Sequence, residues 1–149
     1  MAKKTFKGRV VLPGEVSGKA TVSRQAFNTS GSYQENMFAG RTDSAPCTDS
    51  SNKELYQKDI SGAILCTTTT VGSTMGGMCL MGMKSIGVGP EALLFSKPID
   101  TLAAAGVLMA DIWRKERIVT IDMLGDEFLK VVKTGDPITI KEDGTVEVG

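Results

Sequence analysis

The chain has 149 residues, with 17 lysines and arginines, 17 aspartates and glutamates, and no histidine. Because 41% of the residues are hydrophobic, the sequence predicts one domain, spanning 1–149, with a buried core. The balanced charge argues against nucleic-acid binding and against binding to an anionic membrane surface. The lack of histidine excludes imidazole zinc sites and the Ser–His or Cys–His pairs of nucleophilic enzymes. Any catalysis must use other groups.

The N-terminal region predicts two strands and a long loop. Apolar and β-branched residues over 5–12 predict a strand that ends at Pro13-Gly14, and alternation over 19–23 predicts a second strand. These two strands are expected to pair as a hairpin. Residues 24–58 are polar without sustained periodicity, which predicts a loop. A loop of this length is typical of a binding segment or a lid, and a solvated surface loop is the alternative.

The middle of the chain predicts a strand, a turn and a helix. Residues 61–66 are apolar and predict a buried strand, which leads into a hydroxyl-rich turn over 67–74 and a helix over 75–83. The helix carries methionines at nearly helical spacing: Met75, Met78, and Met81 or Met83. Such a stripe is more often core filling than a cofactor contact, so we expect these methionines to pack in the core.

The C-terminal half alternates strands and helices. The expected elements are a strand over 92–95, a helix over 101–114 with Asp100 as its N-cap, a strand over 118–121, a helix over 124–132, a strand over 138–140, and a tail over 141–148 that closes a hairpin around Asp143-Gly144. Strands thus alternate with helices in the middle of the chain and pair as hairpins at both ends. The predicted fold class is α/β, with a mixed sheet or a small barrel.

The three cysteines, Cys47, Cys66 and Cys79, form no Cys-x-x-Cys pair. Their odd number and spacing predict neither a disulfide framework nor a structural zinc site, which favours a reducing compartment. The first residues lack the apolar stretch of a secretory signal, and no segment approaches the roughly 18 apolar residues of a membrane-spanning helix. We therefore expect a soluble, cytoplasmic protein.

The turn over 67–74 is the best candidate for a binding site. The end of a buried strand that opens into a helix favours anions, because free N–H groups converge there and the helix dipole is positive. Thr68 and Thr70 add hydroxyl groups, and Gly72 lets the backbone approach a ligand closely. The segment lacks the Gly-Lys-Ser/Thr ending of a P-loop, so ATP binding is not expected. A Ser/Thr capping cluster without a ligand is the alternative.

Thiols and carboxylates outside the turn have other expected roles. Cys66 and Cys79 fall in predicted core elements and are expected to be inert packing thiols. Cys47 lies in the polar loop and is expected to be exposed, either as a reactive thiol or as a metal ligand that needs further ligands from another chain. Asp122 and Asp126, with Glu127, flank a strand end and a helix start, where we expect them to act as structural caps.

Three segments together resemble the small, swivelling-domain subunit of the aconitase X family. In order along nearly the whole chain, they are KGRVVLPGEVSGKATVSRQAF (7–27), ILCTTTTVGST (64–74) and LLFSKPIDTLAAAGVLMADIWRKERIVTID (93–122). The resemblance implies a swivelling β/β/α fold like that of aconitase, and a large partner subunit that carries most of the substrate site. It also implies an iron–sulfur cluster held mainly by that subunit, and the elimination of water from a small hydroxy acid.

Within this resemblance, the threonine-rich turn supplies a catalytic hydroxyl. The position that matches the family's proton-accepting serine is Thr69, and Ser73 is the alternative proton acceptor. Arg24 is a candidate for binding the substrate carboxylate together with the turn, and a surface role is its alternative. Cys47 is the candidate for a cluster ligand across the subunit interface.

The resemblance leaves more than one function open. The loop over 28–52 replaces the family's usual Gly-Gly-Val-Asp-Pro loop. Together with the threonine-rich turn and the Ile-Asp-Thr-Leu-Ala-Ala-Ala-Gly segment (99–106), this favours the bacterial type that converts cis-3-hydroxy-L-proline to 1-pyrroline-2-carboxylate. The alternatives are the small subunit of phosphomevalonate dehydratase and a non-catalytic regulatory domain that binds an anion at the same turn.

Overall fold

The computed structural model describes residues 2–72 and 74–149. Within these residues, eight strands form one mixed sheet in the order β1-β10-β9-β3-β5-β7-β8-β2. They are β1 (Lys4–Lys7), β2 (Arg9–Leu12), β3 (Val16–Val22), β5 (Ile64–Thr67), β7 (Ala92–Phe95), β8 (Val119–Asp122), β9 (Pro137–Ile140) and β10 (Thr145–Val148). Two short strands, β4 (Phe27–Asn28) and β6 (Thr70–Val71), pair separately. The helices are α1 (Thr29–Ser32), α2 (Gln34–Phe38), α3 (Gly76–Ser85), α4 (Thr101–Arg114) and α5 (Asp126–Val131).

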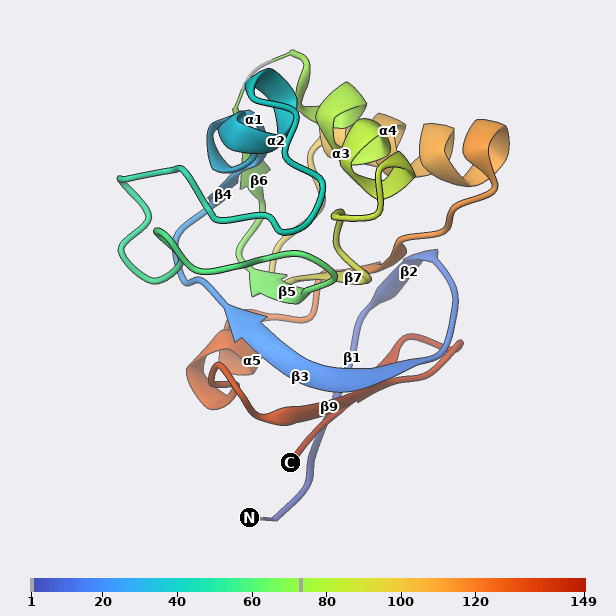
Figure 1. Ribbon diagram of the computed structural model, residues 1–149. Helices are drawn as coiled ribbons and strands as arrows, with labels where there is room; N and C mark the ends of the chain where they lie inside the picture. Colours follow the sequence, from blue (N-terminus) through green and yellow to red (C-terminus); the bar gives the residue numbers. More distant parts are fainter. Residues whose placement is uncertain (1, 73) are drawn as a thin grey trace.

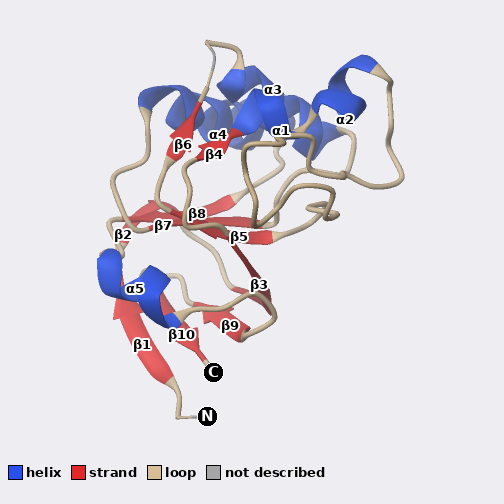
Figure 2. Cartoon of the chain, turned by 90° about the vertical axis from the view of Figure 1, so that its left-hand side faces the viewer, coloured by secondary structure: helices blue, strands red, loops and turns tan. Residues whose placement is uncertain are grey.

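The centre of the sheet is parallel and its flanks are antiparallel. β3, β5, β7 and β8 run in the same direction, with Leu65 opposite Leu93 and Leu93 opposite Thr120. β9, β10 and β1 continue antiparallel from β3, and β2 lies antiparallel to β8. Figures 1 and 2 show α1 to α4 on one side of the parallel strands, with α5, β1, β9 and β10 on the other. The carboxyl ends of the parallel strands therefore meet at one edge, the usual place for a binding site in such sheets.

The sheet closes on itself at Gly8. The expected strand over 5–12 is in fact two strands, β1 and β2, which lie at opposite ends of the sheet order and are separated by this residue. The Gly8 N–H donates to the Gly144 carbonyl (3.1 Å), and a Cβ at position 8 would lie 2.5 Å from the Asp122 carbonyl oxygen. A side chain does not fit this close approach, so glycine is required. The predicted α/β fold with a mixed sheet or small barrel is confirmed as a nearly closed mixed sheet.

Two other predictions for the N-terminal region are wrong. β3 pairs with β9 and β5, and among the described strands no register joins it to β2, so 5–12 and 19–23 form no hairpin. The stretch over 24–58 is more than a loop, because it contains β4, α1 and α2 and buries Tyr33 and Leu55. These apolar side chains anchor an irregular segment to the core. Their spacing follows neither the helix period nor the strand period, so hydrophobic periodicity does not reveal them.

Apolar side chains on both faces of the parallel strands form two cores. In β5, Leu65 belongs to a cluster with residues of α3 and α4, whereas Ile64 and Cys66 belong to a cluster with α5 and the antiparallel strands. Burial on both faces explains why these strands are continuous apolar runs rather than alternating patterns. The ring of Phe128 in α5 packs edge-on against Phe6 of β1, with centroids 5.3 Å apart.

The C-terminal half follows the sequence prediction closely. The expected strand over 92–95 and helix over 101–114 are β7 and α4 with the same bounds. The Asp100 carboxylate caps α4 by accepting hydrogen bonds from two N–H groups of its first turn, at 2.8 and 3.0 Å. β9 and β10 pair around Asp143-Gly144, as expected. Among the described residues, no helix is both long enough and apolar enough to span a lipid bilayer.

Helices α3 and α4 pack so closely that glycines are needed between them. A Cβ at Gly77 would lie 2.4 Å from the Leu102 carbonyl oxygen, and a Cβ at Gly106 would lie 2.4 Å from the Gly77 carbonyl oxygen. The prediction that the methionines of this helix pack in the core is therefore wrong in part. Met75 and Met78 are exposed, Met78 by 64%, because glycine rather than methionine occupies the face of α3 toward α4.

The substitution Gly106→Ala should push α3 and α4 apart and lower the free energy of unfolding by about 1–3 kcal/mol, the usual cost of overpacking. Gly82→Ala is the matched control, because it lies in α3 but has no atom within 4 Å of its Cβ position. The control should be neutral or raise the free energy of unfolding by up to about 1 kcal/mol through helix propensity. Denaturant unfolding followed by circular dichroism measures both. Equal stability of the two variants would contradict the close packing.

Candidate functional site at the carboxyl edge of the sheet

Three segments meet at the carboxyl edge of the parallel strands. They are the turn after β5, the loop over 96–100 between β7 and α4, and the end of β8 at Asp122. The Lys97 N–H donates to the Thr68 carbonyl (3.1 Å), so the main chain of the turn is held against the loop. The predicted binding turn therefore lies where the fold places polar groups from several strands together.

Two hydroxyl groups of the turn hold it in place. Thr67 Oγ1 donates to the Gln25 carbonyl (2.6 Å). Thr70 is buried in β6, opposite Phe27, and its Oγ1 donates to the same Asp100 carboxylate that caps α4. The hydroxyl of Thr70, which was expected to bind substrate, therefore has a partner within the protein.

Thr68 and Thr69 are half-buried and keep access to solvent. The main chain of Thr69 is fixed by its carbonyl, which accepts the Phe27 N–H (2.9 Å). Its hydroxyl donates to the Pro98 carbonyl at 3.2 Å. A hydroxyl that donates one hydrogen bond keeps its two lone pairs, so Thr69 Oγ1 can still accept a hydrogen bond from a ligand.

Gly72 is needed for a close contact within the chain. It has a φ of 95°, and a Cβ there would lie 2.4 Å from Asn28 Oδ1. The same oxygen caps α1 by accepting the Gly31 N–H (2.9 Å). The close approach that was expected for a ligand is therefore made by a side chain of the protein. Ser73, the alternative proton acceptor, lies outside the described residues.

Helix α3 begins directly after the turn. Its N-cap residue, Met75, makes no capping hydrogen bond through its own side chain. The positive end of the helix dipole thus follows the threonine-rich turn along the chain, which is the order of elements that the predicted anion site requires.

An ion pair that the sequence analysis did not predict lies at the same edge. Asp122 is completely buried, and both of its oxygens accept from Arg9, Nε to Oδ1 at 2.9 Å and Nη2 to Oδ2 at 2.6 Å. Oδ2 also accepts the Ile99 N–H (2.8 Å). A carboxylate buried in this way needs such partners, because an unpaired charge is costly to bury. Its hydrogen bonds raise the pKa of the Arg9 guanidinium.

Spacing along the chain offers no signal for this pair, because its members are 113 residues apart. The prediction that Asp122 acts as a structural cap is wrong in its detail, because this carboxylate forms an ion pair with Arg9. The register of β2 against β8 puts Arg9 opposite Asp122. The one hint in the sequence is a charged residue directly after the apolar run over 118–121.

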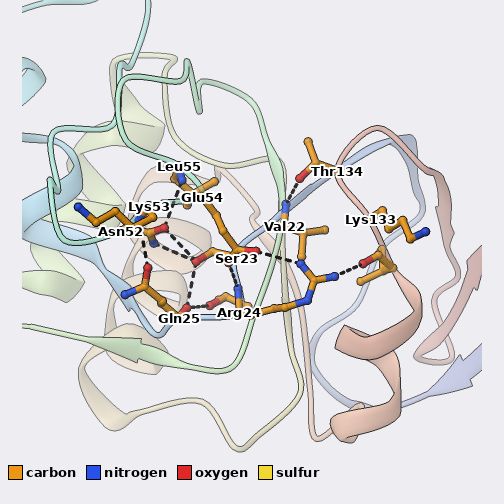
Figure 3. A network of polar contacts seen from close by, with 12 residues as sticks. Val22, Ser23, Arg24, Gln25, Asn52, Lys53, Glu54, Leu55, Lys133 and Thr134 are labelled. Carbon is orange, nitrogen blue, oxygen red and sulfur yellow. Dashed lines mark hydrogen bonds and ion pairs between the residues drawn. The ribbon is translucent and has the colours of Figure 1, made fainter.

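Arg24, the expected substrate-binding arginine, is held by other parts of the chain (Figure 3). Its guanidinium donates to Glu54 Oε1 (2.9 Å) and to the Val132 carbonyl (3.0 Å), and its main-chain N–H donates to the Glu54 carboxylate. In the described part of the chain, no hydrogen bond or ion pair joins this side chain to the turn over 67–72. The structure therefore gives the Arg24 guanidinium partners that lie outside the turn.

All three thiols are buried, so the expectation that Cys47 is exposed is wrong. Cys47 is 1% exposed, because its N–H donates to the Lys58 carbonyl (2.9 Å) and its carbonyl accepts the Gln57 N–H (2.8 Å), which folds the loop over it. Burial raises the pKa of the Cys79 thiol to about 12 and also raises that of Cys66. Since thiolates are the metal-binding form, these two thiols are poor ligands.

The described residues do not fit an iron–sulfur cluster of their own. Among the described residues, no group of three or more Cys, Asp or Glu could hold a metal ion. The expected role of Cys47 as a ligand across an interface also lacks the exposure on which it was based.

The nearly closed mixed sheet, the helical layer on one side and the hydroxyl-rich turn at the carboxyl edge together define a swivel-type α/β domain. Comparison with known proteins agrees with this class. The chain matches the family model of the aconitase X swivel domain over residues 5–148, and it belongs to this family. The family resemblance seen in the sequence is therefore confirmed.

Relatives match along nearly their full length. The phosphomevalonate dehydratase small subunit of Archaeoglobus fulgidus is 27% identical over 144 residues, which cover 96% of this chain and 97% of the relative. The protein of the same name from Aeropyrum pernix is 27% identical over 143 residues, covering 96% and 92%. The crystal structure of Thermococcus kodakaraensis aconitase X in its holo-form has a TM-score of 0.80 at 24% identity and 98% coverage of both chains. It shares the fold of this chain.

Iodoacetamide should not alkylate Cys47, Cys66 or Cys79 in the native protein, because all three side chains are buried. The matched control is Ser50→Cys, which places a thiol at an exposed position of the same loop as Cys47. We expect one adduct in the native control variant, none in the native parent, and three in the denatured parent, as measured by mass spectrometry. Rapid native labelling of Cys47 would contradict the packing of this loop.

Proposed function

We propose that this chain is the small subunit of an aconitase-like dehydratase, a single swivel domain over 1–149 that acts only with a large subunit. The observation that carries the proposal is the half-buried hydroxyl of Thr69, fixed at the carboxyl edge of the parallel strands. Elimination of water needs a proton acceptor and a second group that assists the departing hydroxide. In this proposal the turn offers the proton acceptor, and the large subunit would supply the group that assists the departing hydroxide. The relatives' names, which are all those of small subunits, support such a partner.

We propose phosphomevalonate as the substrate, rather than the cis-3-hydroxy-L-proline that the sequence pattern favoured. Relatives from Archaeoglobus fulgidus, Aeropyrum pernix and Thermococcus sibiricus are all named phosphomevalonate dehydratase small subunits, and they support the alternative reading. The hydroxyproline reading depended in part on the unusual loop over 28–52. In the structure this segment carries Tyr33 and Cys47 into the core, so it contributes to packing.

The proposed role of Thr69 is to accept the proton from the carbon next to the substrate carboxylate, while hydroxide leaves from the neighbouring carbon and a double bond forms. A threonine hydroxyl accepts such a proton only as its alkoxide. Because the described residues fit no cluster, any iron–sulfur cluster belongs to the large subunit in this proposal.

The chain co-expressed with its large subunit should dehydrate phosphomevalonate under anaerobic conditions, and either chain alone should be inactive. The assay offers phosphomevalonate and cis-3-hydroxy-L-proline side by side and follows product by mass spectrometry. Turnover of cis-3-hydroxy-L-proline alone would identify it, rather than phosphomevalonate, as the substrate. Failure to form any complex, with anion binding by the isolated chain, would favour the non-catalytic regulatory domain instead.

In the assembled complex, Thr69→Ala should lower kcat by about 10²–10⁴-fold, the usual contribution of a general base. Thr69→Ser is the matched control, because it keeps the hydroxyl and removes only the methyl group. The kcat of Thr69→Ser should stay within about tenfold of that of the parent complex. Steady-state kinetics and size-exclusion chromatography separate loss of turnover from loss of assembly. Normal kcat in Thr69→Ala would transfer the role to Ser73 or to a group of the large subunit.

A further inference from the structure

We propose that Arg9, oriented by Asp122, binds the carboxylate of the hydroxy acid at the carboxyl edge of the sheet. This inference rests on the proposed dehydratase function and names the group that would hold the reacting end of the substrate. It assigns to Arg9 the role that the sequence pattern had suggested for Arg24, whose guanidinium is paired with Glu54 and the Val132 carbonyl.

The guanidinium of Arg9 is fixed on one side and open on the other. Nε and Nη2 donate to the two oxygens of buried Asp122, and the Arg9 side chain is still 58% exposed. Within the described residues, Nη1 has no hydrogen-bond or ion-pair partner. The Nη1 and Nη2 groups therefore leave a second planar fork of N–H donors, which matches the geometry of a carboxylate.

The loop over 96–100 connects this fork to the proposed base. The Pro98 carbonyl accepts the Thr69 hydroxyl (3.2 Å), and the next residue, Ile99, donates its N–H to Asp122 (2.8 Å). Two consecutive residues thus contact the base and the carboxylate that orients Arg9. The guanidinium and the Thr69 hydroxyl are accordingly positioned by the same short piece of main chain.

The chemistry of the elimination favours a cation at this position. When a base removes a proton from the carbon beside a carboxylate, negative charge spreads onto the carboxylate oxygens. A guanidinium already held in place stabilises this charge without reorganising during the reaction. Asp122 supplies the orientation, since its own charge is buried and both of its oxygens are occupied by Arg9.

The test compares the assembled complex carrying Arg9→Gln together with Asp122→Asn with the parent complex. The double change avoids leaving a buried carboxylate without its cation, which would destabilise the domain. We expect KM for phosphomevalonate to rise and kcat/KM to fall by about 10–100-fold, the range for a hydrogen-bonded charged group. Arg9→Lys, which keeps the charge but loses the planar fork, should give a smaller loss.

Arg117 provides a matched control. Its Nε and Nη2 donate to the two oxygens of Asp111 at 2.8 Å each, which is the same side-on fork, but it precedes β8 and so lies at the opposite edge of the sheet. The double variant Arg117→Gln and Asp111→Asn should leave KM within about twofold, the scatter expected for a residue without substrate contact. Melting temperature and gel filtration confirm that each variant folds and assembles.

The outcomes separate this inference from the proposed function. If the parent complex turns over phosphomevalonate and the Arg9 double variant has an unchanged KM and kcat/KM, the Arg9 inference is wrong and the dehydratase stands. If the parent binds phosphomevalonate in calorimetry without turnover, loss of binding in the variant supports Arg9 while the dehydratase fails, and unchanged binding overturns Arg9. If the parent complex neither binds nor turns over phosphomevalonate or cis-3-hydroxy-L-proline, both are overturned.

Mevalonate, which keeps the carboxylate and lacks the phosphate, identifies the group that Arg9 contacts. Its binding to the parent complex and to the Arg9 double variant is measured by calorimetry. A loss of affinity equal to that for phosphomevalonate supports the carboxylate. A loss seen with phosphomevalonate alone would overturn it and assign Arg9 to the phosphate.

Discussion

The close approach of main chain at Gly8 is the contact on which the rest of the structure depends. Its N–H bonds to the Gly144 carbonyl, and the Asp122 carbonyl lies where a side chain would be. Because the chain passes from β1 to β2 at this point, the two outer strands of the sheet meet and the sheet nearly closes. The same passage places the next residue, Arg9, opposite Asp122, so closure of the sheet and the buried ion pair depend on the same piece of chain.

A second constraint acts at the carboxyl edge. Three consecutive residues of one loop contact three different partners: Pro98 accepts from Thr69, Ile99 donates to Asp122, and Asp100 accepts from Thr70. Asp100 also caps α4, which ties the loop to the helical layer. A polar turn that would be mobile on its own is thereby fixed from both sides, and fixed donors and acceptors are what a binding or catalytic site needs.

Local patterns predicted the elements well where one physical requirement dominates. The run over 92–95 and the Asp100 cap follow from burial and from unsatisfied helix N–H groups, both of which act within a few residues. Predictions failed where distant segments decide burial. Cys47 has polar neighbours in the sequence, yet it is buried because residues 57–58 cover it. Met78 is apolar, yet it is exposed because glycine packs against α4 in its place.

The amino-acid sequence alone determined the α/β class, most of the C-terminal elements and the threonine-rich turn after a buried strand, because short-range periodicity and capping encode them. Only the tertiary structure decided which hydroxyl of the turn keeps access to solvent and which arginine is held at the same edge. Thr70 is occupied by Asp100, Arg24 by Glu54, and Arg9 by Asp122 with one side left open. These pairings join residues at least 30 positions apart, so they form only in the folded chain.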